Sequence, residues 1–382
     1  MRFEFAAAGR IVFGCGAASE LAGFMREFGS RAFVVTGSGP KRHKALLDSL
    51  AAVEAVRFAV SGEPSVSTVA QAVEPARASG CDVVVGIGGG SVIDTAKAVA
   101  ALLTNPGEVM EYLEVVGQGR PLVNMAAPCI AVPTTAGTGS EVTRNAVLSV
   151  PDKHVKVSMR SAGMLPRIAV IDPYLTRSMP PELTAATGMD ALTQLIEPYV
   201  CTRANPLTDG ICIEGLTCAA RSLRTAYEDG EDMGARQDMA VASLFGGLAL
   251  ANAGLGAVHG LAGPLGGMTP APHGVICGRL LAAVMRTNLH VLRRDNPDSP
   301  ALGKYARIAR ILTGNPDAAA DDGPEWVARL TADLEIPSIR SFGLTTTLIP
   351  DAAQQARQAS SMKANPAVLT QHDLKKILTE CL

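Results

Sequence analysis

The chain has 382 residues, of which 47% are hydrophobic and 18% are charged, and this balance excludes an intrinsically disordered protein. A net charge of -2 and a pI near 6.3 argue against nucleic acid or an anionic membrane surface as a partner. The length is sufficient for two domains of ordinary size.

The cysteines and the N-terminal stretch bear on the compartment. Eight cysteines are spread along the chain without a CxxC pair, which is typical of reduced thiols rather than of a disulfide framework. The stretch MRFEFAAAGR contains no long apolar run, so we expect no secretory signal. Together these features predict a cytoplasmic protein.

The first half of the chain alternates β-rich runs with helical patterns. The runs predicted as strands are RAFVVT (31–36), CDVVVGIGGG (81–90), CIAVPTT (129–135) and RIAVIDP (167–173). Helical patterns lie between them, for example at 66–79 and 92–104. Such alternation predicts a Rossmann-like parallel sheet, so residues 1–180 are expected to form an α/β domain.

The pattern changes to helices at about residue 180. Two prolines followed by Glu182 are typical of a helix start, and long helical patterns follow. Residues 239–278 contain no Asp, Glu, Lys or Arg, but prolines and frequent glycines interrupt them. We therefore expect a buried interior segment rather than a membrane span. Residues 181–382 are predicted to form an all-helical domain.

The motif GIGGGSVIDTAK (86–97) follows a predicted strand and opens a predicted helix. Consecutive glycines expose backbone N–H groups, and the helix N-terminus adds its positive dipole end, so the motif can bind a pyrophosphate. A plain glycine turn is the alternative, and Asp94 with Lys97 has the spacing of an ordinary intrahelical ion pair. The residues predicted to contact a cofactor here are Gly88, Gly89, Gly90, Ser91 and Asp94.

A second loop, PTTAGTGSE (133–141), follows the third predicted strand. The hydroxyl groups of Thr134, Thr135 and Thr138 are candidates for contacts with phosphate or ribose oxygens, although a simple polar loop is the alternative. Because both loops follow parallel strands, they are expected at the same carboxyl edge of one sheet. This placement favours a dinucleotide site.

A third group of residues points to a metal. Asp190 and Gln194 share one face of an otherwise apolar helical stretch, GMDALTQLIE (188–197). A buried carboxylate is costly unless it is paired or bound to a metal. His259 and His273 lie in the uncharged segment, and two imidazoles with one carboxylate suit Zn²⁺ or Fe²⁺. The alternative is that each histidine is a hydrogen-bonded core residue.

In these motifs the chain resembles the iron-containing (group III) alcohol dehydrogenases, which include glycerol dehydrogenase-like and maleylacetate reductase-like members. The resemblance implies a dehydroquinate synthase-like fold, NAD or NADP, one divalent metal, and hydride transfer between the nicotinamide and an alcohol, aldehyde or ketone. It also implies a homodimer or a larger homo-oligomer. It covers nearly the whole chain and is carried by GGGSVIDTAK (88–97), PTTAGTGSE (133–141), GMDALT (188–193), GAVHGLAGPLG (256–266) and PHG (272–274).

The resemblance assigns the metal-binding and catalytic roles to Asp190, His259 and His273. The chain departs from the iron-type pattern at Gln194, where the family has a third histidine, and at Gly263, where it often has a histidine linked to proton relay. The three retained ligands resemble the zinc-type glycerol dehydrogenase branch. The carboxamide oxygen of Gln194 is expected to be a weak fourth ligand of Fe²⁺ or Zn²⁺.

The resemblance also bears on the nucleotide. Asn145 and Lys156 match family positions near the nicotinamide ribose, although a solvated surface lysine is the alternative. In VVTGSGPKRHK (34–44), Gly37 stands where the family commonly has an acid that binds the ribose 2′-hydroxyl. Gly37, Ser38 and the basic residues 41–43 suit a 2′-phosphate better, which favours NADP over NAD. A polar loop that tolerates either cofactor is the alternative.

Other functions are compatible with parts of this pattern. A metal-free reductase of maleylacetate type would explain the loss of histidine at Gln194, but not the buried Asp190. A lyase of the dehydroquinate synthase type also uses a nucleotide and a metal. A catalytically silent nucleotide-binding protein is a further alternative, although Asp190, His259 and His273 argue against it.

Overall fold

A computed structural model of the chain describes residues 2–153 and 155–382, except for the side chains of Pro40, Lys41 and Ala52. The chain packs as two compact units. The first, Ala6–Ser178, is called the α/β unit. The second, Met179–Leu382 together with the N-terminal residues up to Phe5, is called the helical unit.

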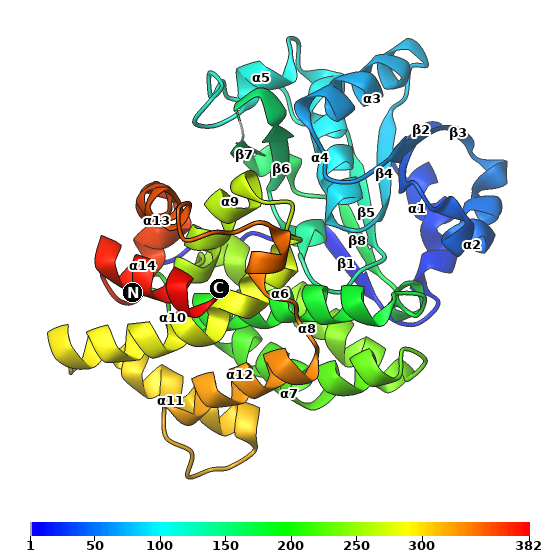
Figure 1. Cartoon of the computed structure of the whole chain (residues 1–382). Coiled ribbons are helices and arrows are strands. Elements are labelled where there is room, and N and C mark those ends of the chain that lie inside the picture. Colours follow the sequence, from blue (N-terminus) through cyan, green and yellow to red (C-terminus); the bar gives the residue numbers. More distant parts are fainter. Residues whose placement is uncertain (1, 154) are drawn as a thin grey trace. The chain divides into compact units, whose positions relative to one another are not determined.

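The α/β unit is built on a six-stranded parallel sheet with the strand order β1-β8-β5-β4-β2-β3 (Figure 1). Its strands are β1 (Arg10–Phe13), β2 (Arg31–Gly37), β3 (Glu54–Val60), β4 (Val83–Gly88), β5 (Cys129–Pro133) and β8 (Ile168–Ile171). β6 (Asn145–Val150) and β7 (Val155–Arg160) form a separate antiparallel pair. The helices are α1 (Leu21–Arg26), α2 (Lys44–Ser49), α3 (Val66–Ala78), α4 (Gly90–Thr104) and α5 (Val109–Tyr112).

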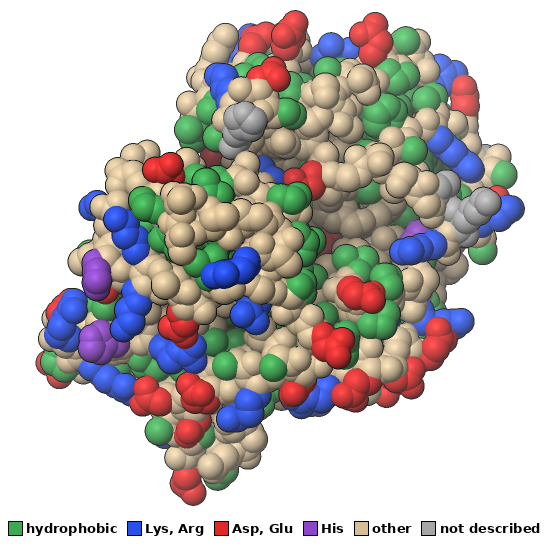
Figure 2. Space-filling view, viewed as in Figure 1, with side chains coloured by type: hydrophobic (Ala, Val, Ile, Leu, Met, Phe, Trp, Pro, Cys, Tyr) green, Lys and Arg blue, Asp and Glu red, His purple; other side chains and the backbone are tan. Residues whose placement is uncertain are grey.

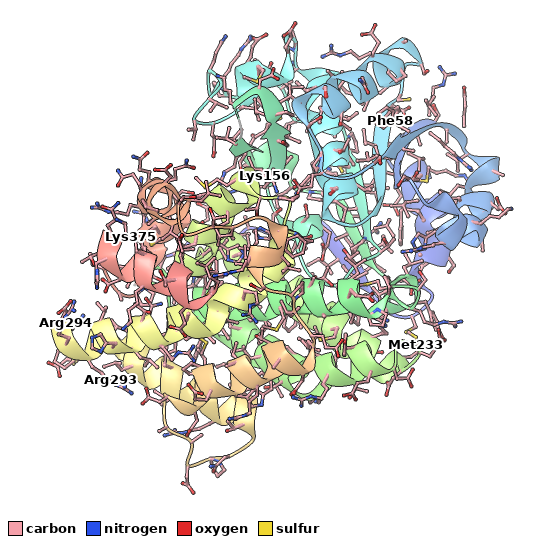
Figure 3. All side chains as sticks on the ribbon, viewed as in Figure 1. Phe58, Lys156, Met233, Arg293, Arg294 and Lys375 are labelled. Carbon is pink, nitrogen blue, oxygen red and sulfur yellow. The ribbon has the colours of Figure 1, made fainter. Side chains whose placement is uncertain are left out.

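Both faces of the sheet are covered. Phe33 and Val35 of β2 belong to a core with α3 and α4, whereas Ala32 and Val34 belong to a core with α1 and α2. This two-sided burial explains why the strands are continuously apolar rather than alternating. At the edge strand β3, Phe58, which is labelled in Figure 3, stacks on Phe33 with 6.1 Å between the ring centroids.

The strand order also marks a place for a ligand. From β2 the chain continues to β3, towards one edge of the sheet, whereas from β4 it continues to β5, towards the opposite edge. The carboxyl ends of β2 and β4 therefore form the topological switch point, where open α/β sheets bind their ligands. Gly37 and Ser38 end and follow β2, and the glycine motif follows β4.

The helical unit contains no strand among residues 179–382, all of which the structure describes. Its helices are α6 (Pro181–Val200), α7 (Pro206–Glu228), α8 (Met233–Asn252), α9 (Ala257–Met268), α10 (His273–Asp295), α11 (Pro300–Thr313), α12 (Asp322–Asp333), α13 (Ile349–Gln358) and α14 (Gln371–Glu380). α6 is almost entirely buried and packs against α7, α8 and α10. The predicted fold class, an α/β region followed by a helical one, is confirmed.

Most charged side chains of the helical unit lie on its surface, with Asp190, Glu197 and Arg236 among the buried exceptions. Acidic and basic side chains are interspersed over the face shown in Figure 2, and several pair between helices, such as Arg286 with Glu325 and Arg293 with Asp321. α10 is long and apolar enough to cross a membrane, but 78% of its apolar window is buried inside the protein. α8 and α9 pass the same test only as a pair that is bent by 98°. This extent of burial is that of a core helix.

Glycines allow α10 to lie directly on α6. A Cβ at Gly274 would stand 2.1 Å from the carbonyl oxygen of Ala186, and one at Gly278 would stand 3.1 Å from Cβ of Met189. The first two turns of α10 therefore touch the part of α6 that carries Asp190.

Gly274→Ala tests this contact. Because the added methyl group meets backbone rather than a movable side chain, we expect the free energy of unfolding to fall by about 1–3 kcal/mol. Gly303→Ala is the control, since its Cβ meets nothing within 4 Å on the exposed face of α11, and it should stabilise the protein by up to about 1 kcal/mol. Denaturant unfolding measures both. Equal stability of the Gly274→Ala variant and the wild type would contradict the close contact.

Candidate metal centre and nucleotide loops

α6 carries three polar side chains on a buried face. The helix begins with Pro181 at its first turn, where the missing N–H costs no hydrogen bond. Asp190, Gln194 and Glu197 follow at intervals of four and three residues, so they share one side of the helix. All three are buried. Each of them needs a polar partner in the interior.

Two histidines from other helices meet Asp190. His259 lies in the first turn of α9, and its Nε2 is 3.4 Å from Oδ1 of Asp190. His273 begins α10, and its Nε2 is 3.7 Å from the same oxygen. The side chains of Asp190 and His259 are 3% and 7% exposed, whereas that of His273 is 41% exposed. The structure thus brings together the three residues that the sequence predicted as metal ligands.

Two atoms of this cluster lack partners. Among the described residues, neither Oδ1 of Asp190 nor Nε2 of His259 has a hydrogen-bond partner, although both are buried. Their separation of 3.4 Å is longer than an ordinary N–H···O hydrogen bond. Buried polar atoms without partners are costly, and a divalent ion bound by both would satisfy them. The donor set of one carboxylate and two imidazoles fits such an ion.

Glu197 holds His259 from the other side of the ring. Its Oε2 lies 2.6 Å from Nδ1 of His259, and its Oε1 accepts a hydrogen bond of 2.6 Å from the backbone N–H of Val258. Gly256 permits this approach, because a Cβ there would stand 2.8 Å from Oε1. A carboxylate on the outer nitrogen is the usual way to orient a metal-binding histidine. Glu197 was not predicted from the sequence, although its position on the same helical face as Asp190 was a usable signal.

The charges of the cluster are coupled. Burial lowers the pKa of His259, but the carboxylates of Asp190 and Glu197 outweigh it and raise this pKa to about 10. Burial raises the pKa of Asp190, but His273 and His259 outweigh it and hold this pKa below its usual range. A proton on Nε2 of His259 therefore competes with a metal for the same position, and metal binding has to release it.

The structure adds Cys277 to this cluster. Its Sγ lies 3.6 Å from Nε2 of His273, one turn earlier on α10. One ligand atom from each of Asp190, His259, His273 and Cys277 falls within 4.8 Å of the other three. No role was predicted for Cys277 from the sequence, although its four-residue spacing from His273 places both on one helical face.

The two departures from the iron-type pattern have different surroundings. Oε1 of Gln194 is buried, has no hydrogen-bond partner among the described residues, and would lie 3.3 Å from a Cβ at Gly246 of α8. Gly263 lies exposed on α9, and a Cβ there would meet nothing within 4 Å. Ligation by Gln194 stays a prediction.

In the α/β unit, the two predicted nucleotide loops pack against each other. The backbone N–H of Thr134 donates a hydrogen bond of 2.9 Å to the carbonyl oxygen of Gly88. A Cβ at Gly89 would stand 3.3 Å from the side chain of Thr135, and one at Gly90 would stand 2.9 Å from that of Thr138. Side chains are therefore excluded where the glycine motif opens α4, whose first residue is Gly90 and second is Ser91. Their backbone N–H groups remain suited to a phosphate.

Asp94 and Lys97 form the ion pair that their spacing indicated, with Nζ of Lys97 3.0 Å from Oδ1 of Asp94. Lys97 is fully buried and donates to the carbonyl oxygens of Ser140 and Asn145 and to the hydroxyl of Thr143. Asp94 accepts hydrogen bonds from the hydroxyl of Ser140 and the backbone N–H of Val147. Both side chains thus fasten the chain after β5, and a direct cofactor contact of Asp94 stays a prediction.

Four further residues were predicted to contact the cofactor, namely Gly37, Ser38, Asn145 and Lys156. Lys156, labelled in Figure 3, belongs to β7 and donates a hydrogen bond of 2.7 Å to Glu63. Asn145 begins β6. A Cβ at Gly37 would meet nothing within 4 Å, and Ser38 is exposed.

The basic stretch that follows Ser38 is partly described. The backbone N–H of Arg42 donates to the carbonyl oxygen of Gly39, within a turn of 3-10 helix at Pro40–His43. Burial and the neighbouring Arg42 lower the pKa of His43. The side chain of Lys41 lies outside the described residues.

Comparison with known proteins identifies the family. A model of the iron-containing alcohol dehydrogenases matches residues 8–173, and a model of the C-terminal region of the same family matches residues 184–382. The 1,3-propanediol dehydrogenase of Citrobacter freundii is 37% identical over 337 residues, which are 86% of this chain and 84% of the relative.

Solved structures agree with this match. A 1,3-propanediol oxidoreductase superposes with a TM-score of 0.92 at 33% identity, and the match covers 100% of both chains. A sulfoacetaldehyde reductase from Bifidobacterium kashiwanohense, solved with NAD⁺, superposes with a TM-score of 0.89 at 28% identity and covers 100% of this chain and 99% of that one.

The chain belongs to the iron-containing alcohol dehydrogenase family. It is a metal-dependent oxidoreductase that transfers hydride between NAD(P)(H) and an alcohol, aldehyde or ketone. The family, the fold class and the enzyme class predicted from the sequence are confirmed.

Glu141, in the loop after β5, is a buried carboxylic acid whose ionisation destabilises the folded state. Burial raises the pKa of Glu141 to about 7 from its ordinary 4.5, against smaller opposing effects of a backbone hydrogen bond and of Lys97. The folded state therefore binds the proton more tightly, and stability is lost as pH rises from the unfolded value through the folded one.

Glu141→Gln should remove this dependence. Between about pH 5 and about pH 8, the unfolding free energy of the wild type should fall relative to the variant by on the order of 3 kcal/mol, because the two pKa values differ by 2.5 (7 minus 4.5). Denaturant unfolding at each pH measures the difference. Glu74→Gln, at an exposed position of α3, controls for the loss of one carboxylate. A difference that does not change with pH would contradict a raised pKa at Glu141.

Proposed function

We propose that Asp190, His259 and His273 hold the divalent metal of this alcohol dehydrogenase, and that the loops after β2, β4 and β5 hold its nicotinamide cofactor. The observation that carries the metal assignment is a pair of buried atoms, Oδ1 of Asp190 and Nε2 of His259, which lie 3.4 Å apart and have no hydrogen-bond partner within the part of the chain that the structure describes. In this proposal residues 1–180 form the cofactor-binding domain and residues 181–382 the metal- and substrate-binding domain.

The bound metal would provide Lewis-acid catalysis. A divalent ion acts as a Lewis acid that lowers the pKa of an alcohol hydroxyl, or polarises a carbonyl group in the reverse direction. Glu197 fixes the ring of His259 so that Nε2 faces Asp190. His273 is half-exposed, so the cluster is accessible on that side. Either Fe²⁺ or Zn²⁺ is compatible with these three side chains.

The cofactor is bound chiefly by backbone groups in this proposal. The N–H groups of Gly88 to Ser91 would bind the pyrophosphate at the start of α4. Thr134, Thr135 and Thr138 would contact the nucleotide with their hydroxyl groups. Asn145 and Lys156 would lie near the nicotinamide ribose, which requires Lys156 to leave or share Glu63. Asp94 is proposed to act through the loop that it fastens.

The substrate is proposed to be a small primary or secondary alcohol and its carbonyl partner. 1,3-Propanediol is the first compound to test, because the name of the Citrobacter relative contains it. The protein is further proposed to be cytoplasmic and a homodimer or larger homo-oligomer. Turnover is measured by nicotinamide absorbance with a panel of alcohols and aldehydes, and gel filtration with light scattering measures the oligomeric state.

The metal assignment predicts the composition of the purified protein. Protein prepared without chelator should contain one divalent ion per chain by elemental analysis. His259→Ala should lose most of this metal and most of the turnover, since it removes one of three ligands and leaves Asp190 uncompensated. His290→Ala, at an exposed position of α10, is the matched control and should keep both. Unchanged metal content in His259→Ala would refute the assignment.

A preference for NADP(H) is proposed from the end of β2. Gly37 and Ser38 present no carboxylate to the 2′ position, and Arg42 and His43 follow them in a short turn of 3-10 helix, Pro40–His43. An acid at Gly37 would repel a 2′-phosphate but could bind a 2′-hydroxyl. Its side chain would be accommodated, since a Cβ at this position meets nothing within 4 Å.

Gly37→Asp should therefore change cofactor choice. The wild type should have a higher kcat/KM with NADPH than with NADH on one shared aldehyde, and the variant should lower this ratio by about tenfold or more through like-charge repulsion. Gly23→Asp, which adds the same charge on an exposed part of α1, should leave the ratio unchanged. A wild type that prefers NADH would disprove the proposal.

A further inference from the structure

Cys277 occupies an unusual position for a structural cysteine. It is fully buried on α10, one turn after His273, and Gly278 beside it packs on Met189 of α6. Its sulfur therefore faces the same space as Nε2 of His273, at 3.6 Å. No other cysteine among the described residues belongs to a group of potential metal ligands.

We propose that Cys277 is the fourth protein ligand of the metal centre, as a thiolate, and that it makes the centre selective for Zn²⁺ over Fe²⁺. The inference rests on the proposed metal role of Asp190, His259 and His273. It names the soft ligand of that centre and the ion that this ligand favours.

The distances fit one ion at the centre of a tetrahedron. Bonds of about 2.0–2.2 Å to nitrogen or oxygen and about 2.3 Å to sulfur set edges of about 3.4 Å between O and N and about 3.6 Å between S and N. The corresponding separations are 3.4 and 3.7 Å from Asp190 to the two histidines, and 3.6 Å from Cys277 to His273. The other three separations among the four ligand atoms lie within 4.8 Å.

A separate observation indicates that this space belongs to a ligand. Oδ1 of Asp190 and Nε2 of His259 are both more than nine-tenths buried and have no hydrogen-bond partner among the described residues. The sulfur of Cys277 lies within 4.8 Å of one potential ligand atom of each of these two residues. The thiol is thus placed beside polar atoms that already require a partner.

The type of donor atom in the fourth position determines which metal ion the centre prefers. Thiolate sulfur is a soft donor that favours zinc, whereas carboxylate and imidazole accept several divalent metals. The competing fourth ligand, the amide oxygen of Gln194, is a neutral donor that lies against Gly246. On binding, the S–H bond breaks, a sulfur–metal bond forms and the proton passes to solvent, with no change of oxidation state.

The test replaces the native metal with Co²⁺, whose bond to a thiolate absorbs in the near ultraviolet. Metal-free protein, prepared with a chelator, is titrated with Co²⁺ while absorbance and stoichiometry are followed. X-ray absorption of the zinc-loaded wild type then measures whether the shell contains a bond of about 2.3 Å, typical of Zn–S, beside bonds of about 2.0–2.1 Å.

The wild type should bind one Co²⁺ with thiolate absorption, and its zinc shell should contain one sulfur. Cys277→Ser and Cys277→Ala should both lose the absorption and bind Zn²⁺ at least about tenfold more weakly. In a mixture of Zn²⁺ and Fe²⁺ without oxygen, the ratio of bound zinc to bound iron should fall in both variants. Cys212→Ser, at a buried cysteine of α7, is the matched control and should behave as the wild type.

The outcomes separate this inference from the proposed function. If the wild type binds one ion without thiolate absorption and without a zinc–sulfur bond, Cys277 is not a ligand, but the centre of Asp190, His259 and His273 stands. If the wild type binds no ion at all, the proposed metal centre is wrong, and the inference falls with it. Both outcomes are measured on the wild type, so they do not depend on the stability of the variants.

Discussion

The direct contact of α10 with the backbone of α6 determines the geometry of the metal cluster. His273 and Cys277 reach Asp190 because Gly274 and Gly278 let the two helix axes approach where any side chain would intervene. The backbone carbonyl of Ala186 cannot move aside without disturbing the α6 hydrogen bonds. The placement of two polar side chains in the interior therefore depends on two residues that have no side chain.

A second carboxylate links this cluster to the start of another helix. Glu197 accepts a hydrogen bond from the N–H of Val258 and pairs with Nδ1 of His259, so one side chain caps α9 and orients its histidine. Asn365 accepts from the neighbouring N–H of Ala257 in the same turn. The N-cap residue itself is Gly256, which offers no side chain for this purpose. The contacts of Glu197 that form the first turn of α9 therefore also orient His259.

Much of the architecture could be predicted because it rests on local patterns. Continuous apolar runs followed by glycine or hydroxyl loops identified β2, β4, β5 and β8, and the buried acid in an apolar stretch identified Asp190. The strand β3 was not predicted, because its exposed edge carries Glu54 and Arg57 among the apolar residues. The antiparallel pair β6–β7 was not predicted either, and it is held partly by the distant Asp94 and Lys97, which no local pattern reveals.

The site was harder to predict than the fold for a related reason. Asp190 and the two histidines could be found because ionisable groups are conspicuous in an uncharged segment. Glu197 and Cys277 were missed because their significance comes from residues of other helices: Glu197 of α6 contacts His259 of α9, and Cys277 of α10 lies close to Asp190 and His259.

The surroundings of Gly263 and Gln194 imply different evolutionary freedom at these two positions. A side chain at Gly263 would project into open space from the exposed face of α9, so an imidazole could return there without repacking. Gln194 is buried on α6 and lies against Gly246 of α8, where an added Cβ would stand 3.1 Å from the Cβ of Gln194. Position 263 can therefore take a side chain without meeting a neighbour, whereas any residue larger than glycine at position 246 would have to fit against Gln194.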